Sequence, residues 1–209
     1  MKILHLYHDL MNLYGEYANV SALERKLQEK GADVSIDRLS IGDEISAGDY
    51  DFIYIGSGTE LNQKAALEDI RRLSADIRTA LEKGAVVLAT GNAFELFGRS
   101  ITDYQGKQYD GLGFFDFTVT ESDKRTVEDV KCTCSLVDGD VIGFINKASE
   151  IEGITEPFFA VAKECGNCRG ECTEGIVSGS FYGTHIIGPL LIRNPQICEY
   201  FAQLILGRE

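Results

Sequence analysis

The sequence predicts an α/β protein, with a parallel sheet covered by helices on both faces in the first half and antiparallel strands in the second half. Up to about residue 98, short continuous apolar runs alternate with amphipathic segments, which is typical of parallel strands covered by helices. From about residue 114, apolar runs follow one another through short connections that contain Gly or Asp, which favours antiparallel pairing. The chain has 209 residues and no linker or internal repeat, so we expect a single domain over residues 1–209.

The first half alternates predicted strands and helices. Apolar residues at helical spacing predict helices over residues 13–30 and 62–83, each followed by a glycine, and a short helix that begins near Asn92. Between these helices, continuous or alternating apolar runs predict strands over residues 2–7, 32–39, 51–56 and 85–90.

The second half is predicted to consist mostly of strands, followed by one helix. The helix covers about residues 195–206, with Asn194 as its N-cap and Pro195 at its first position. The strands are predicted over residues 114–120, 125–137, 141–147, 157–164 and 175–187.

The net charge of the chain argues against a generic nucleic-acid binder. Asp plus Glu number 33 and Lys plus Arg number 20, a formal charge of −13 at pH 7, whereas phosphate binding requires clustered Lys and Arg. No segment has the roughly 18–20 apolar residues of a membrane span, and the N-terminus predicts a first strand instead of a signal peptide. We therefore expect a cytoplasmic protein with reduced thiols that contacts neither nucleic acid nor membrane.

The segment at residues 85–98 carries the most information about function. A buried strand turns sharply into a helix at Gly91, which is the layout of a nucleophile elbow, where a strained turn lifts one side chain above the sheet edge. Glycine suits a strained backbone but has no nucleophilic atom. The alternative is a turn that uses Gly91 for its geometry alone. The strand ends at residues 8–10 and 56–59 are expected to converge on this turn.

Motifs along nearly the whole chain resemble one family, with weaker similarity over about residues 126–171. They include LYHDLMNLYGEYANVSALERKL (6–27), YIGSGTELNQ (54–63), GAVVLATGNAFELFG (84–98), DGLGFFDFTVT (110–120) and CTEGIVSGSFYGTHIIGPLLIRNP (172–195). In this order they resemble the cobyric-acid-synthase-like class I glutamine amidotransferases, and among these the glutaminase subunits of lipid II isoglutaminyl synthase. The resemblance implies a flavodoxin-like three-layer fold that requires no cofactor, with ammonia released from glutamine and passed to a synthetase.

Both catalytic positions of that family hold other residues here. The family's elbow carries a Cys that attacks the side-chain amide of glutamine, and a His on a late strand is the base. By resemblance, the nucleophile position is Gly91 and the base position is Ile187, in the segment HIIGP. No Cys precedes residue 132, and Thr90 is expected to point into the sheet. We therefore predict that glutaminase activity is lost, because the covalent step needs both groups.

Four residues are predicted to bind a ligand at the strand ends. The resemblance places Arg125 near the family's clamp for the α-carboxylate of glutamine, a pairing that is strong when bidentate. It places Gly58 where backbone N–H groups stabilise an oxyanion, and Asn92 beside the elbow. His185, two residues before the base position on a continuing strand, would border the pocket. The alternatives are a surface charge for Arg125, a steric role for the glycine-rich turn, and a half-exposed strand residue for His185.

The cysteines gather in the second half, where the family needs none. Cys132 and Cys134 would share one face of a strand, and a loop contains Cys165, Cys168 and Cys172. Such clustering predicts a thiolate site for Zn²⁺ or an iron–sulfur cluster. A redox dithiol and unrelated free thiols are the alternatives. The remaining cysteine, Cys198, is expected in the core.

Three functional hypotheses follow from the sequence. The first is an amidotransferase-like subunit without glutaminase activity that serves as partner or regulator of a Mur-ligase-like synthetase. The second is a metal- or thiol-based module built on the five clustered cysteines. The third is a different enzyme that uses the strand-end pocket, in which an acid or base would come from Asp9, Glu60, Glu95, His8 or His185.

Overall fold

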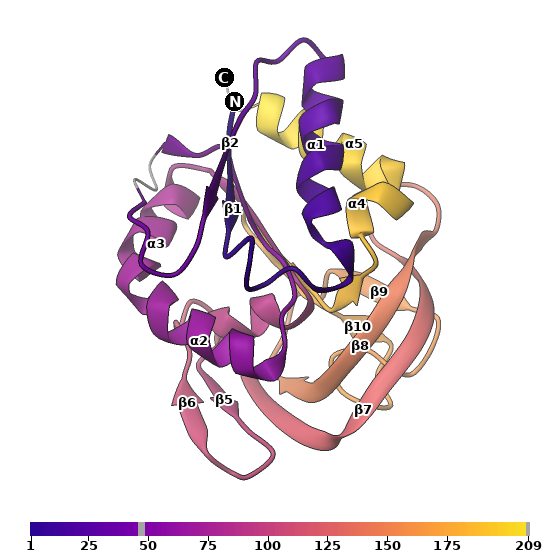
Figure 1. Cartoon of the computed structure of the whole chain (residues 1–209). Helices are drawn as coiled ribbons and strands as arrows, with labels where there is room; N and C mark the ends of the chain where they lie inside the picture. The colour runs from indigo at the N-terminus through magenta and orange to yellow at the C-terminus, as the bar shows by residue number, and fades with distance from the viewer. Residues whose placement is uncertain (46–48, 208–209) are drawn as a thin grey trace.

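The computed structural model describes residues 1–45 and 49–207, and its main sheet is parallel, as predicted (Figure 1). This sheet has six strands in the order β11-β12-β4-β3-β1-β2. Neighbouring strands are parallel except β11, which pairs antiparallel with β12 at one edge. The strands are β1 (Lys2–Leu6), β2 (Ser35–Leu39), β3 (Phe52–Ile55), β4 (Val86–Thr90), β11 (Ile176–Ser178) and β12 (Phe181–Thr184).

Helices cover both faces of this sheet because its central strands are apolar on both sides. In β3, for example, Ile53 belongs to one core cluster and Phe52 to the other, as expected when successive side chains point to opposite faces. Figure 1 shows α2 (Glu60–Ile70) and α3 (Ser74–Glu82) on one side of the strands. On the other side lie α1 (Tyr17–Glu29), α4 (Leu190–Arg193) and α5 (Pro195–Leu206).

The long helix predicted over residues 62–83 is two helices in the structure. A 3₁₀ turn at Arg71–Leu73 separates α2 from α3. The turn buries Leu73 in the core while Arg71 remains exposed and donates from Nη2 to the backbone oxygen of Asp110 (2.5 Å). The apolar spacing is continuous through this change of direction, which is why the sequence predicted one element. At the other end, the Thr59 hydroxyl caps α2 by accepting from the Asn62 N–H (3.1 Å).

A second sheet contains most of the antiparallel strands predicted for the second half. The predicted strands 114–120 and 125–137 merge into one long strand, β7 (Thr118–Thr133), which pairs antiparallel with β8 (Val141–Glu152). Their register shifts between Glu121 and Thr126, as at a β-bulge. The sheet also contains β5 (Ser100–Thr102), β6 (Gln108–Asp110), β9 (Phe159–Val161), β10 (Thr173–Glu174) and β13 (Ile186–Ile187).

Two strand pairs that involve the second half are parallel, beside the antiparallel pairs that were predicted. Strand β5 pairs parallel with β7, and β12 joins the main sheet parallel to β4. The single strand predicted over residues 175–187 is divided, because the chain turns at Gly179 (φ +57°) between β11 and β12 and then crosses to the second sheet as β13. This crossing brings residues 185–187 against the end of the main sheet.

Two residues were predicted to mark the start of the C-terminal helix, and one of the two predictions is confirmed. Pro195 is the first residue of α5, as predicted. The Asn194 side chain makes no capping hydrogen bond to α5. Its amide binds β8 instead, accepting from the Ile142 N–H and donating to the Ile142 oxygen, both at 2.8 Å. In the described ranges, no helix is long and apolar enough to cross a membrane.

Candidate functional site

A pocket of about 250 Å³ opens at the carboxyl ends of β3 and β4. The four residues predicted to bind a ligand all line it, and so do both positions predicted to replace the catalytic pair. We call it the strand-end pocket. Its lining residues are Leu13, Tyr14, Ser57, Gly58, Thr59, Glu60, Gln63, Gly91, Asn92, Glu95, Glu121, Arg125, Asn146, Lys147, Ala148, Ser149, His185 and Ile187.

One of the three converging strand ends does not reach this pocket. Neither His8 nor Asp9 is among the lining residues. Asp9 instead accepts a hydrogen bond from the Ser40 hydroxyl (2.6 Å), and the His8 ring lies edge-on to His5 at 6.1 Å. His8 and Asp9, two of the candidate acids or bases of the third hypothesis, therefore lie outside the pocket, because the chain continues past residue 10 and presents Tyr14 and its neighbour Leu13 at that wall.

The elbow turn (residues 90–92) has the strained backbone that the sequence predicted. Gly91 has φ +60°, in the left-handed region that favours glycine, and it begins a 3₁₀ helix, η4 (Gly91–Phe97). A Cβ atom at position 91 would overlap the Cβ of Ser57 and lie 3.2 Å from its Cα. Ser57 thus fills the space that a side chain on the elbow would need. Its own hydroxyl is buried and has no hydrogen-bond partner.

A buried carboxylate, Glu16, lies beneath the elbow turn. Thr90 points into the sheet, as predicted, and its hydroxyl donates to Glu16. The same carboxylate accepts from the Tyr54 hydroxyl (2.9 Å) and from the Gly188 N–H (3.2 Å). All of these partners are uncharged, so burial dominates and raises the pKa of Glu16 above its ordinary value.

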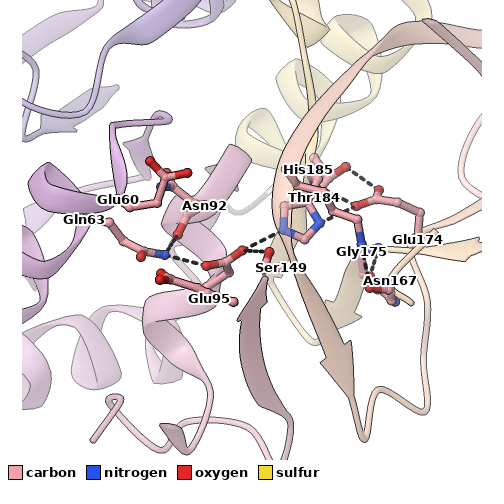
Figure 2. Close-up of polar contacts among 12 residues, drawn as sticks. Glu60, Gln63, Asn92, Glu95, Ser149, Asn167, Glu174, Gly175, Thr184 and His185 are labelled. Atoms are coloured by element: carbon pink, nitrogen blue, oxygen red, sulfur yellow. Dashed lines mark hydrogen bonds and ion pairs between the residues drawn. The ribbon is translucent and has the colours of Figure 1, made fainter. Parts of the chain in front are cut away.

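His185 lies between two carboxylates on the pocket side of the elbow turn (Figure 2). Its Nε2 is 2.9 Å from Oε1 of Glu95, and its Nδ1 is 3.5 Å from Oε1 of Glu174. His185 is only 2% exposed, so the half-exposed alternative is wrong. The reason is the crossing between the two sheets, which leaves His185 covered on both sides and packed edge-on against Phe94 (4.6 Å).

Polar partners outweigh the cost of burying Glu95. Burial by itself would raise the pKa of this carboxyl, but the hydrogen bond and charge of His185 and the bonds from Ser149 and Gln63 leave it below the ordinary value. Ser149 Oγ and Gln63 Nε2 each donate to Glu95 at 2.5 Å. Glu95 therefore carries its charge in the interior at neutral pH.

A buried lysine completes the charged groups on this side. Lys147 donates from Nζ to the backbone oxygens of Gly166 (2.5 Å) and Asn167 (2.6 Å), and burial lowers its pKa. The carboxylates of Glu95 and Glu174 oppose this shift. We call Glu95, Lys147, Glu174 and His185 the charge cluster, two acidic and two basic side chains with almost no exposure to solvent.

Arg125 lies at the mouth of the pocket, where the bulge in β7 presents it. Its guanidinium donates from Nη2 to Glu60 at the start of α2 and from Nη1 to Oδ1 of Asn146 (3.0 Å). Asn146 in turn donates to the Tyr14 hydroxyl (2.7 Å). A chain of polar contacts thus crosses the mouth. Arg125 lies in the pocket wall, as predicted, and its guanidinium is bound by the carboxylate of Glu60.

The Gly58 backbone, predicted as an oxyanion site, is paired with the side chain of Asn92. The Gly58 N–H donates to Oδ1 of Asn92, and Nδ2 of Asn92 donates to the Gly58 oxygen, both at 3.0 Å. Asn92 is itself held by Gln63, whose Nε2 donates to the Asn92 backbone oxygen (2.7 Å; Figure 2). The Gly58 N–H, which a ligand oxygen would need as a donor, is therefore already bound to Asn92.

The metal site predicted from the cysteines stays a prediction, and the structure describes where each thiol lies. Within residues 1–45 and 49–207, no three His, Cys, Asp or Glu side chains are grouped so that they could hold a metal ion, and all six cysteines are free. Burial raises the pKa of Cys132, Cys165 and Cys168, which disfavours thiolates. Strand β7 ends at Thr133, so Cys134 lies beyond it, while Cys172 is exposed. Cys198 is in the core, as predicted.

Some residues in or beside the pocket had no clear signal in the sequence. Ser149 lines the pocket from β8, and Glu174 on β10 contacts His185, and both strands reach this region only through long-range pairing. Ser57 belongs to a glycine-rich turn that drew attention, but its packing against Gly91 depends on the three-dimensional approach of two strand ends. Gln63 lies one helical turn after the cap of α2, a spacing that could have suggested a pocket-facing side chain.

The parallel sheet, the left-handed turn after β4 and the pocket at its strand ends have the architecture of class I glutamine amidotransferase domains. One solved structure of a glutamine amidotransferase superposes with a TM-score of 0.60 at 14% identity, covering 97% of this chain and 98% of that chain. The glutaminase domain of Trypanosoma brucei CTPS with bound acivicin superposes with a TM-score of 0.58 at 8% identity, covering 100% and 95%. Residues 2–195 match the CobB/CobQ-like glutamine amidotransferase domain, and the chain belongs to this family.

Two characterised relatives have the same name. The chain is 28% identical over 200 residues to subunit GatD of the glutamine-hydrolysing lipid II isoglutaminyl synthase of Streptococcus pneumoniae, covering 94% of this chain and 77% of the relative. It is 24% identical over 209 residues to the Staphylococcus aureus subunit GatD, covering 100% of this chain and 86% of the relative. The predicted resemblance to these subunits is confirmed.

Proposed function

We propose that this chain is a GatD-like subunit that does not hydrolyse glutamine and that acts as partner or regulator of a Mur-ligase-like synthetase. The observation that carries the proposal is the elbow turn, where Gly91 supplies no nucleophile and Ser57 fills the space above it. Amide hydrolysis by this family needs a thiolate at that point, and a base without a nucleophile contributes little rate.

The rest of the pocket supports the same proposal. Ile187, at the base position, has no proton to exchange, and the nearest histidine, His185, is engaged with Glu95 and Glu174. Gly58, in the oxyanion position, already donates its N–H to Asn92. Each step of covalent amide hydrolysis therefore lacks its group: nucleophile, base and an open oxyanion donor.

A direct assay tests the loss of activity. The purified chain is incubated with L-glutamine, alone and with its synthetase partner, and glutamate is measured, with the S. pneumoniae subunit GatD as the positive control. We expect no glutamate above the rate without protein in either condition. Turnover comparable to that of the relative would refute the proposal.

The partnership needs its own test, since the names of the relatives describe subunits of a larger synthase. The chain and a Mur-ligase-like synthetase from the same genome are mixed and separated by size-exclusion chromatography. We expect co-elution, and we expect the synthetase to depend on added ammonium salts because the subunit supplies no ammonia. Separate elution at micromolar concentrations, or glutamine-driven synthesis, would contradict this part of the proposal.

A further inference from the structure

The mouth of the strand-end pocket holds an internal carboxylate. Glu60 binds Arg125, although both side chains are partly exposed, at 46% and 42%. The pair is not between neighbours on one element, since Glu60 begins α2 and Arg125 lies in the bulge of β7. An exposed ion pair of this kind contributes little to the free energy of unfolding. Stability alone therefore does not explain why Glu60 and Arg125 pair across the mouth.

The inner end of the pocket holds an internal amide. Asn92 pairs with both the N–H and the oxygen of Gly58 at 3.0 Å, the two-point contact that a ligand amide would make with a backbone. The Gln63 side chain fixes Asn92 from behind by donating to its backbone oxygen. Asn92 is thus held in this arrangement from two sides.

Among the described residues that line the pocket, two buried polar atoms make no hydrogen bond, the Ser57 hydroxyl and Nδ1 of His185, and the first of these lies beside the elbow turn. The Ser57 hydroxyl is 3% exposed, lines the pocket and has no hydrogen-bond partner. Buried hydroxyls are normally satisfied, so this atom marks the part of the pocket that the chain's own side chains leave unfilled.

We propose that Glu60 and Asn92 are internal occupants of the strand-end pocket, a carboxylate and an amide that take the places of the corresponding groups of a small ligand. The side chains that line the pocket therefore keep the positions that a bound ligand would give them, although no ligand is bound. The subunit would present the same pocket conformation to its partner at any ligand concentration. This inference rests on the proposed function, because a working glutaminase would have to keep these places open for its substrate.

The internal carboxylate is the easier of the two to displace. Glu60 loses only a partly exposed ion pair when it leaves Arg125, whereas Asn92 would break paired hydrogen bonds in a part-buried site. Removing the Glu60 charge therefore frees the guanidinium for a ligand carboxylate. We expect a gain in affinity of about two- to fivefold, the factor that a competing surface ion pair of this strength accounts for.

Calorimetric titration with two probes, L-glutamine and L-glutamate, tests the proposal on the whole chain. The Glu60→Gln variant is expected to bind at least one probe about two- to fivefold more tightly than the wild-type chain. Glu68→Gln, on the exposed side of the same helix, is the matched control and is expected to leave the affinity unchanged. Adding Arg125→Gln to the Glu60 variant is expected to abolish the gain.

The outcomes separate this inference from the proposed function. Equal affinity of wild type and Glu60→Gln, tighter binding by wild type, or no binding of either probe by Glu60→Gln would each overturn the internal-occupant proposal. Urea unfolding of every variant confirms that the chain is folded. Glutamate is measured in the same samples, and its release by the wild-type chain would refute the proposed function independently of the affinity ratio.

Discussion

Glu16 and Glu95 are buried carboxylates on opposite sides of the elbow turn, and they differ in their partners. Glu16 is 0% exposed and receives hydrogen bonds only from neutral groups, two hydroxyls and a backbone N–H. Glu95 is 2% exposed and lies beside His185. The pKa of Glu16 is raised and that of Glu95 is lowered. Equal burial therefore gives opposite electrostatic outcomes, and the charged carboxylate is the one that lines the pocket.

The largest effect is expected from neutralising the charged member of this pair. Glu95→Gln removes the negative charge beside His185 and leaves a buried basic group without one of its partners. We expect a loss of about 3 kcal/mol in the free energy of unfolding at pH 7, because the buried carboxylate that accepts hydrogen bonds from Ser149 and Gln63 is replaced by a neutral amide that cannot accept both. Urea unfolding measures it, with Glu68→Gln as control. A loss below about 1 kcal/mol would show that the charge cluster is not electrostatically coupled.

A second effect concerns the turn that separates the two carboxylates. Gly91→Ala is expected to cost about 2–3 kcal/mol, because alanine is disfavoured at positive φ and its Cβ would overlap Ser57. In a double-mutant cycle, Ser57→Gly should recover the part of this cost that comes from overlap. Additive effects of the two substitutions would mean that Ser57 does not limit the space above the elbow.

The corresponding substitution on the other side of the turn, Glu16→Gln, should be tolerated. Glu16→Gln keeps an acceptor oxygen for Thr90 and Tyr54 and removes a carboxyl whose charge burial disfavours. We expect a change of no more than about 1 kcal/mol in unfolding free energy at pH 7. An equal loss of unfolding free energy in Glu16→Gln and Glu95→Gln would contradict the conclusion that the two carboxylates differ in their electrostatic environment.

The two variants should also differ in how their stability responds to pH. The lowered pKa of Glu95 contributes stability that is present above its ordinary value of 4.5 and is lost as the pH falls through the folded-state pKa. The deficit of Glu95→Gln should therefore narrow below pH 4.5. The raised pKa of Glu16 acts in the opposite sense, so Glu16→Gln should gain stability relative to wild type as the pH rises above 4.5. Unfolding midpoints of wild type and both variants, measured from pH 3.5 to 7.5, test this. Curves of midpoint against pH that run parallel for all three proteins would contradict the predicted difference.

The main sheet was predictable because its strands are locally marked. The apolar runs at β1, β3 and β4 have the continuous character of strands buried on both faces, and glycines end the predicted helices. The division of residues 175–187 between two sheets was not predictable, because it depends on which distant strands each short segment meets. The hairpin of β5 and β6 was missed because it has only three residues in each strand.

The candidate site was predicted in its location and only partly in its chemistry. Gly91, Ile187, Arg125, Gly58, Asn92 and His185 all line the pocket, as their motifs indicated. The sequence could not reveal that Asn92 pairs with Gly58 or that Glu60 binds Arg125, since both contacts join separate elements. The metal site stays a prediction from cysteine spacing: Cys132 and Cys165 are buried whereas Cys172 is exposed, and the described residues contain no group of three ligands that could hold a metal ion.

The contact between Ser57 and Gly91 has a consequence for the evolution of this chain. A return to a nucleophilic elbow by Gly91→Cys alone would meet the Ser57 side chain before it could gain any activity. Ser57 would have to change first, and that change brings no catalytic benefit without the cysteine. The two substitutions are therefore epistatic, because the effect of a side chain at position 91 depends on which side chain stands at position 57.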